Sequence, residues 1–184
     1  MLDSNHQILT VGRSGHGKTL GALSWATLGP MHVLSLDRRT AILKDRENVT
    51  FDVFSPRDGY IKVDQKLESY LKLGNKLPFK TLGLFGVTAL IDFLTVDSGK
   101  LLGAMSDSDK KSFSTGQKIG SLYLPGWADY NYVSEALRQI FYNGLFLLPC
   151  NIIVEANVVN AYDMNGKISG DKILATDKVA EKIP

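Results

Sequence analysis

The chain contains 184 residues, of which 44% are hydrophobic and 22% are charged, values typical of a globular protein rather than a disordered one. Its 21 basic and 19 acidic residues give a formal charge of +2, which neither requires nor excludes a nucleic-acid partner. The single cysteine, Cys150, excludes an internal disulfide, and no Cys/His cluster has zinc-ligand spacing, so we expect a reducing, cytoplasmic compartment.

The first half of the chain predicts alternating strands and helices. Strands are expected over three short apolar runs, residues 6–11, 31–36 and 49–54. Helices are expected where apolar residues recur every three or four positions, at residues 19–27 and 63–73. Compact apolar runs that end in polar residues are typical of parallel strands buried on both faces.

The second half continues the alternation around a polar segment. A short strand is expected at residues 93–96, directly before Asp97. Residues 104–126 are rich in Asp, Lys, Ser and Gly and predict a mobile surface insertion. A long helix is expected at residues 129–148, followed by a strand at about 151–158.

This order of elements predicts an α/β fold for the whole chain. We expect one domain over residues 1–184, with a three-layer αβα arrangement and a mainly parallel central sheet. Pro149 and several polar residues interrupt the most apolar stretch, residues 141–159, so no membrane span is predicted. The first residues show no basic region followed by an apolar run, so no signal peptide is predicted.

The glycine-rich segment after the first strand matches the phosphate-loop pattern G-x-x-x-x-G-K-[ST] in full. Glycines allow the backbone to curve so that its N–H groups point at phosphate oxygens, and the following helix adds its free N-terminal N–H groups. The lysine reaches the β- and γ-phosphates, and the threonine hydroxyl binds Mg²⁺. The predicted nucleotide-binding residues are Gly12, Arg13, Ser14, Gly15, His16, Gly17, Lys18, Thr19 and Leu20.

Such a site also needs a carboxylate at the end of another core strand, which holds Mg²⁺ directly or through water. Asp92 and Asp97 are both candidates. Asp97 is preferred because it follows the expected strand at residues 93–96, whereas Asp92 has large apolar neighbours that suit a helix. The alternative for Asp97 is an ordinary turn or helix cap.

The general base is less defined, because Ser98 rather than Glu follows Asp97. Asp37 ends the second strand, where its side chain could face the γ-phosphate. Glu155 lies on the last core strand, but a carboxylate inside a strand can point away from the site. Asn157, near the end of that strand, is a candidate for binding the attacking water or the γ-phosphate, and strand-end capping is the alternative for it and for Asp37.

With these features the chain resembles RecA-like P-loop ATPases, and more narrowly the compact bacteriophage ATPases of recombination and single-strand annealing. Three segments carry the resemblance, VGRSGHGKT at residues 11–19, FLTVDSGKLLG at 93–103, and the block 127–157. The resemblance departs in two places. Asp37 stands where the family usually has Glu, and the chain stops at residue 184 where the family usually continues with further strands, as a minimal protein or a fragment would.

The resemblance implies an activity and a set of partners. It implies Mg²⁺-dependent hydrolysis of ATP, a homo-oligomeric ring or filament with nucleotide between subunits, and single-stranded DNA as the partner. It also implies that Lys18 and Thr19 hold phosphate and Mg²⁺, that Asp97 is the second Mg²⁺ residue, and that Asn157 is the polar sensor. Catalytic roles are thus expected for Lys18, Asp37, Asp97 and Asn157.

Basic and aromatic residues outside the loop are weaker candidates. Arg138 is a candidate arginine finger, with a structural ion pair as the alternative. The insertion carries basic and aromatic residues that suit a DNA-contacting loop, and a plain solvated loop is the alternative. The aromatic residues of the long helix are expected to pack against the sheet or to stack on adenine. These further candidates are Arg38, Arg39, Lys110, Lys111, Phe113, Tyr123, Trp127, Tyr130 and Tyr132.

Three functions remain open on the sequence. The leading hypothesis is a DNA-dependent ATPase. The second is a small nucleoside or metabolite kinase, in which Asp37 and the following arginines would grip an acceptor. The third is a nucleotide-dependent assembly switch without turnover.

Overall fold

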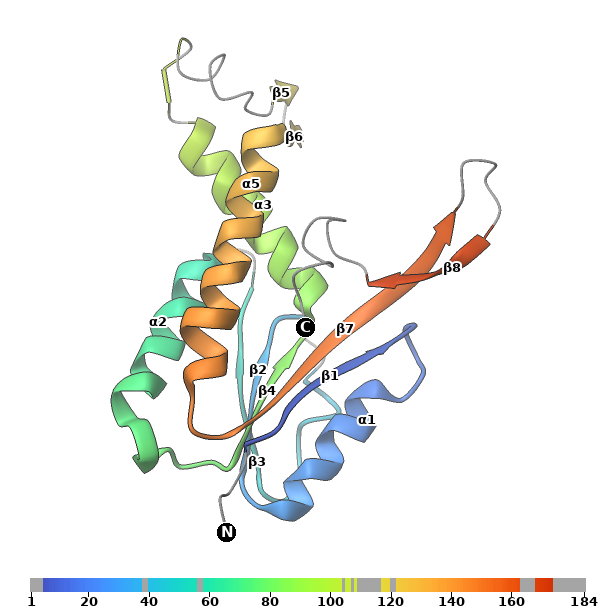
Figure 1. Cartoon of the computed structure of the whole chain (residues 1–184), viewed down its shortest axis with the longest axis vertical. Helices are drawn as coiled ribbons and strands as arrows, with labels where there is room; N and C mark the ends of the chain where they lie inside the picture. The colour runs from blue at the N-terminus through green and yellow to red at the C-terminus, as the bar shows by residue number, and fades with distance from the viewer. Residues whose placement is uncertain are drawn as a thin grey trace.

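The computed structural model describes residues 5–37, 40–55, 58–103, 105, 106, 108, 117–119, 122–162 and 168–173. Within this part of the chain the central sheet consists of five parallel strands in the order β1-β7-β4-β2-β3 (Figure 1). The predicted α/β class with a parallel sheet is therefore confirmed. The strands are β1 (Gln7–Gly12), β2 (Met31–Ser35), β3 (Val49–Val53), β4 (Thr81–Phe85) and β7 (Asn151–Tyr162).

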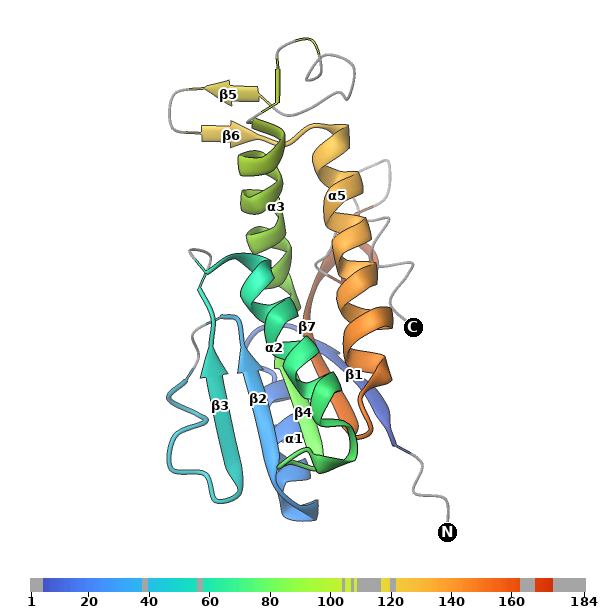
Figure 2. The same cartoon turned by 90° about the vertical axis from the view of Figure 1, so that its left-hand side faces the viewer.

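Helices cover both faces of this sheet, which gives a three-layer arrangement (Figures 1 and 2). A short helix, α1, continues as the 3-10 helix η1 and lies on one face. Three longer helices lie on the other face, where they share one large apolar core with the strands. None of the described helices is long and apolar enough to span a bilayer. The helices are α1 (Lys18–Leu23), η1 (Ser24–Leu28), α2 (Gly59–Leu73), α3 (Val87–Gly103) and α5 (Trp127–Arg138).

Side chains of β7 alternate between these two faces, as expected for a strand. Ile152 and Val154 join the core under the three long helices, whereas Ile153 joins the smaller core under α1. Glu155 and Asn157 follow Ile153 at two-residue spacing and therefore belong to the α1 face. This alternation directs polar side chains of β7 toward the loop that precedes α1.

The prediction of a strand at residues 93–96 is wrong. These residues lie inside α3, and the strand of this region is β4, which the sequence analysis missed. Val87, Leu90 and Leu94 are fully buried at helical spacing, so one helical face continues through the segment that resembled a strand. Gly86, with φ of 89°, separates strand from helix.

The predicted long helix is confirmed in extent, but it changes its winding. After α5 the chain forms a π-helix, η3 (Gln139–Gly144), and a 3-10 helix, η4 (Leu145–Leu147), before Pro149. The pair of α3 and α5 extends beyond the sheet, and a small hairpin of β5 (Gln117–Ile119) and β6 (Leu122–Leu124) lies at its far end (Figure 2). The predicted insertion, residues 104–126, thus contains this hairpin, whereas its residues 104, 107, 109–116, 120 and 121 lie outside the described part.

Strand β7 is longer than the predicted strand at residues 151–158. Its second half pairs in antiparallel fashion with β8 (Ile168–Ile173), so the two form a ribbon beside the parallel sheet (Figure 1). The residues that connect the two strands lie outside the described part of the chain.

Candidate functional site

The loop between β1 and α1 has the backbone geometry that its motif requires. Gly15 and Gly17 have φ values of 81° and 75°, in the left-handed region that favours glycine. Gly12 ends β1, and a Cβ built there would lie 3.4 Å from the side chain of Lys18. Residues 13–17 are exposed, so the loop is open to a ligand.

Lys18 folds back over this loop. Its side chain is buried, with 7% exposed, and its Nζ donates a 2.8 Å hydrogen bond to the carbonyl oxygen of Arg13. The ammonium group therefore lies inside the curve of the loop. A cation in that position is suited to contact phosphate oxygens held by the loop N–H groups.

Thr19 connects the loop to the neighbouring strand. Its hydroxyl donates a 2.8 Å hydrogen bond to Oε2 of Glu155, which is 2% exposed. From the sequence alone the Glu155 side chain could point either to the site or away from it, and in the structure it points to Thr19. Residue alternation on β7 could have indicated its face only once the pairing of β1 with β7 was known.

Asp97 is placed differently from its prediction. It lies in α3, where its Oδ2 accepts the backbone N–H of Tyr60 at 2.8 Å and its Oδ1 contacts Lys100 Nζ at 3.2 Å. Gly59 has φ of 69°, and a Cβ there would lie 2.7 Å from Oδ2 of Asp97. These contacts tie Asp97 to the start of α2 and give it a structural role, not a place beside Thr19. Asp92 lies exposed on the same helix, as its neighbours suggested.

Asp37 is positioned at the carboxyl ends of two strands. It follows β2 by two residues, as predicted, and packs against Gly86 at the end of β4. A Cβ at residue 86 would lie 3.0 Å from the Cβ of Asp37, so this close approach requires glycine. Asp37 is thus separated from the phosphate loop by the positions of β4 and β7 in the sheet.

Asn157 lies beside the first residue of the motif. In the parallel pairing of β1 with β7, Asn157 is the register partner of Gly12. Its Oδ1 is buried and has no hydrogen-bond partner in the described chain, and the same holds for Oγ of Ser35 on β2. Buried polar atoms are normally satisfied, so Asn157 Oδ1 marks a position that suits a polar ligand or water.

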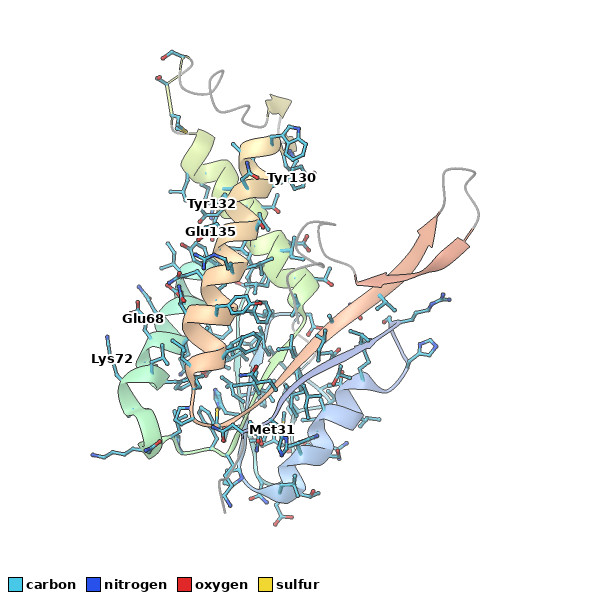
Figure 3. All side chains as sticks on the ribbon, viewed as in Figure 1. Met31, Glu68, Lys72, Tyr130, Tyr132 and Glu135 are labelled. Atoms are coloured by element: carbon cyan, nitrogen blue, oxygen red, sulfur yellow. The ribbon has the colours of Figure 1, made fainter. Side chains whose placement is uncertain are left out.

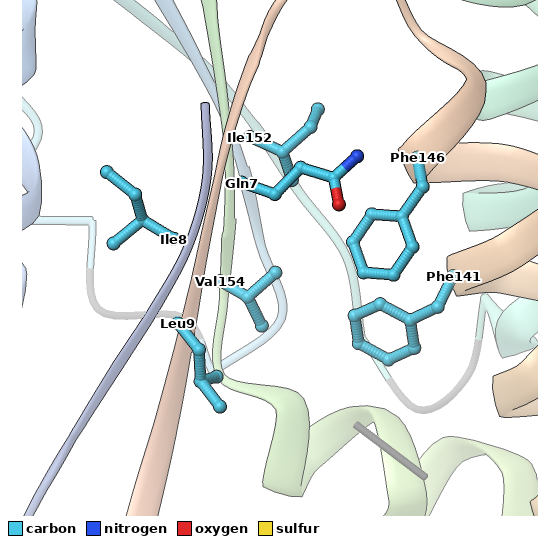
Figure 4. Close-up of a pocket in the computed structure, with 7 residues that line it drawn as sticks. All are labelled: Gln7, Ile8, Leu9, Phe141, Phe146, Ile152 and Val154. Atoms are coloured by element: carbon cyan, nitrogen blue, oxygen red, sulfur yellow. The ribbon is translucent and has the colours of Figure 1, made fainter. Parts of the chain in front are cut away.

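Among the cavities bounded by described residues, one beside the phosphate loop suits a polyanion and one beside β1 does not. A cavity of about 390 Å³ is bounded by the phosphate loop, Leu20, Ala41 and Ile42. A smaller cavity of about 130 Å³ lies between β1, β7, Phe141 and Phe146, and Gln7 is the polar side chain in it (Figure 4). The first therefore matches the predicted nucleotide site, whereas the second has the character of an apolar packing defect.

The site offers few metal ligands of its own. No group of three or more His, Cys, Asp and Glu side chains that could hold a metal ion occurs among the described residues. Mg²⁺ in nucleotide sites typically takes one or two protein oxygens and completes its octahedron with phosphate and water. The Thr19 hydroxyl and the Glu155 carboxylate fit that pattern.

The remaining candidates are spread over the molecule. Arg138 pairs with Glu135 one turn earlier, at 3.0 Å, which is the structural alternative to an arginine finger. Trp127 and Tyr130 are 61% and 45% exposed, so the expectation that they pack against the sheet is wrong. Tyr132 packs edge-on against a tyrosine of α2 with ring centroids 6.1 Å apart. The side chains of Arg38, Arg39, Lys110, Lys111, Phe113 and Tyr123 lie outside the described part of the chain.

No model of a known protein family matches the chain, and no curated protein matches it. The assignment of function therefore depends on the motif, its geometry and the side chains around it.

Proposed function

We propose that the chain binds a nucleoside triphosphate, ATP by its resemblance, together with Mg²⁺ at residues 12–20 and hydrolyses it. One observation carries this proposal. A full phosphate-loop motif with left-handed Gly15 and Gly17 ends a parallel strand, with its lysine folded over the loop and its threonine in contact with a buried carboxylate. Motif and structural context thus agree, as the phosphate-loop assignment requires.

The residues of the loop would share the work of binding. Backbone N–H groups of the loop hold phosphate oxygens, and Lys18 exchanges the carbonyl of Arg13 for the β- and γ-phosphates. Mg²⁺, when bound, neutralises charge that develops on the transferred phosphoryl group. Asn157 hydrogen-bonds the γ-phosphate or the attacking water. Asp37, the base expected from the sequence, is separated from the loop by β7 and β4 and is given no part in this step.

Single-stranded DNA and a second subunit are proposed as partners of this activity. The helix pair of α3 and α5 extends beyond the sheet, and Tyr130 lies near its far end (Figure 3). Trp127 and Tyr130, in the first turns of α5, are both exposed. Exposed aromatic rings provide stacking platforms for unpaired bases. Residues 13–17 are also exposed, so a neighbouring subunit of a RecA-like ring or filament has access to the nucleotide.

The experiment is to measure ATP binding and phosphate release for the wild type and for Lys18→Ala, with and without single-stranded DNA. Lys18→Ala should lower turnover by at least about a hundredfold, because it removes the cation that stabilises the transferred phosphate. Lys72→Ala, at an exposed position on α2, is the matched control and should leave turnover unchanged (Figure 3). Turnover by Lys18→Ala at the wild-type rate would refute the proposal. Product analysis distinguishes free phosphate from a phosphorylated small molecule.

A further inference from the structure

One row of residues crosses the α1 face of the sheet near its carboxyl edge. The strand registers make Thr10, Glu155, Phe85, Ser35 and Val53 successive neighbours from β1 to β3. In this row Glu155 is the carboxylate, on the strand that directly adjoins the phosphate-loop strand.

Strand β4, the next one along, brings no acidic side chain to this position. Phe85 is 3% exposed and belongs to the apolar core under α1. The residues that follow it, Gly86, Val87 and Thr88, are not acidic either. Asp97, the acid suggested by the sequence, is bound to the start of α2. The carboxylate of the site therefore comes from β7.

The distance between Thr19 and Glu155 suits a shared metal ion. Their oxygens Oγ1 and Oε2 are 2.8 Å apart. Two adjacent ligands of an octahedral Mg²⁺, each at 2.0–2.1 Å, lie about 2.9 Å apart. Both oxygens could therefore enter one coordination sphere, or share one shell of bound water, with little movement.

The burial of Glu155 agrees with such a role. Its side chain is 2% exposed, and buried carboxylates in proteins are paired or coordinate metal ions. Asn157 follows on the same face, and its buried Oδ1, with no hydrogen-bond partner in the described chain, can accept a hydrogen bond from a metal-bound water. Two polar groups of one strand thus converge beside the loop.

We infer that Glu155 and Thr19 together form the Mg²⁺ site of the bound nucleotide, with Asn157 as a partner of the metal-bound water. This inference rests on the proposed function, because the ion is held together with a nucleotide. The Thr19 hydroxyl keeps its proton and turns a lone pair to the cation, and Glu155 binds as the carboxylate.

The first test measures the affinity of the full chain for a fluorescent ADP analogue in EDTA and in saturating Mg²⁺. Glu155→Gln preserves the side-chain shape and removes the charge. In saturating Mg²⁺ its affinity for the ADP analogue should be about tenfold or more below that of the wild type, whereas in EDTA the two affinities should be equal. Asp97→Asn is the matched control and should keep the full gain from Mg²⁺.

A second readout detects the metal itself. Mn²⁺ replaces Mg²⁺, and electron paramagnetic resonance counts free Mn²⁺ during a titration in the presence of ADP. Glu155→Gln should weaken Mn²⁺ binding by about tenfold or more. Glu155→Asp keeps the charge but shortens the side chain, so it should weaken Mn²⁺ binding less, and it serves as the test variant if Glu155→Gln does not fold.

The outcomes separate this inference from the proposed function. If Mg²⁺ raised the nucleotide affinity of Glu155→Gln as much as that of the wild type, the inference would be wrong while the proposed function would stand. The same would follow if both Glu155 variants bound Mn²⁺ as the wild type does. The inference would also be wrong if Asp97→Asn lost the increase in nucleotide affinity that Mg²⁺ produces while it unfolded thermally like the wild type. The metal site would then lie at Asp97 on α3. A wild-type chain that binds no nucleotide in either buffer would overturn the proposed function and this inference with it.

Discussion

Two regions of the molecule bury carboxylates for different purposes. In the helical region, Asp97 accepts the backbone N–H of Tyr60 at the start of α2, and Asp129 accepts that of Gly126 at the start of α5. At the phosphate loop, Glu155 accepts the side-chain hydroxyl of Thr19. Burial is similar in all three, at 8%, 0% and 2% exposed.

The hydrogen-bond partner, rather than burial, therefore distinguishes a structural carboxylate from a candidate functional one. A carboxylate that satisfies backbone N–H groups at a helix start stabilises that helix. A carboxylate that contacts the hydroxyl of Thr19 lies where we propose that Mg²⁺ binds. Asp129 extends the structural group, because it also accepts a 2.8 Å hydrogen bond from Ser98 and so joins α3 to α5.

The largest expected loss of stability comes from removing the carboxylate of Asp97 in the helical region. Asp97→Ala should lower the free energy of unfolding by about 2 kcal/mol, because it leaves the N–H of Tyr60 without its charged acceptor. Urea unfolding measures this loss. Glu155→Gln should cost less, since it retains an oxygen that accepts from Thr19.

A second variant tests the same junction from the other side. Gly59→Ala places a Cβ at positive φ and close to Asp97, so it should also destabilise the fold. If Asp97→Ala unfolds like the wild type while Glu155→Gln loses several kcal/mol, the roles assigned to the two carboxylates are reversed.

The next effect concerns the far end of the helix pair. Trp127→Ala should weaken binding of single-stranded DNA by about 1–3 kcal/mol, the usual contribution of a base stacked on an aromatic ring. Its stability should hardly change, because the ring is 61% exposed. Fluorescence anisotropy with a labelled oligonucleotide measures the affinity.

Leu147→Ala is the matched control for that variant. Leu147 is equally exposed, at 62%, but lies in η4 after the helix, near the base of the pair. It should leave DNA affinity unchanged. Equal losses in both variants would argue against a stacking platform at Trp127.

The smallest expected effect is a pH dependence remote from both regions. Burial lowers the pKa of His32, although Asp52 opposes that shift, and Lys66 pairs with Asp52 at 2.7 Å. The unfolded chain then binds more protons than the folded chain below pH of about 6.5, so stability should fall as the pH decreases through that range. His32→Gln should make this decrease shallower in urea unfolding at pH 5–7. An unchanged slope would show that other groups cause it.

The local geometry of residues 12–19 could be predicted from the sequence because the residues that produce it are consecutive. Eight consecutive residues specify the curved backbone, the cation and the hydroxyl, and the structure places Lys18 and Thr19 accordingly. The strands before and after it are compact apolar runs with clear ends. Such features need no information about distant parts of the chain.

The second acidic position could not be predicted in the same way. Phe93 to Val96 resembles a strand when read alone, and only the buried helical face from Val87 to Leu94 shows otherwise. Strand β4 was missed because it contains Gly83, a residue depleted in strands. A Cβ at Gly83 would lie 2.9 Å from Met31 Cε and 2.9 Å from Phe85 Cε1, so neighbouring side chains pack into the space that this glycine leaves.

The direction of the Glu155 side chain could not be predicted because it depends on tertiary structure. Its type and position were visible in the sequence, but its direction depends on which face of β7 meets α1. A shift of one residue in the register of a strand turns every side chain to the opposite face. The pairing of β7 between β1 and β4 determines the face of the sheet on which Glu155 lies.

A crystal structure of the chain grown with Mg²⁺ and ADP would locate both the nucleotide and the metal ion. We expect phosphate oxygens against the loop of residues 12–19 and a Mg²⁺ ion about 2.1 Å from Thr19 Oγ1, with Glu155 in or next to its coordination shell. Nucleotide bound elsewhere, or an ion held by Asp97 on α3, would contradict this expectation.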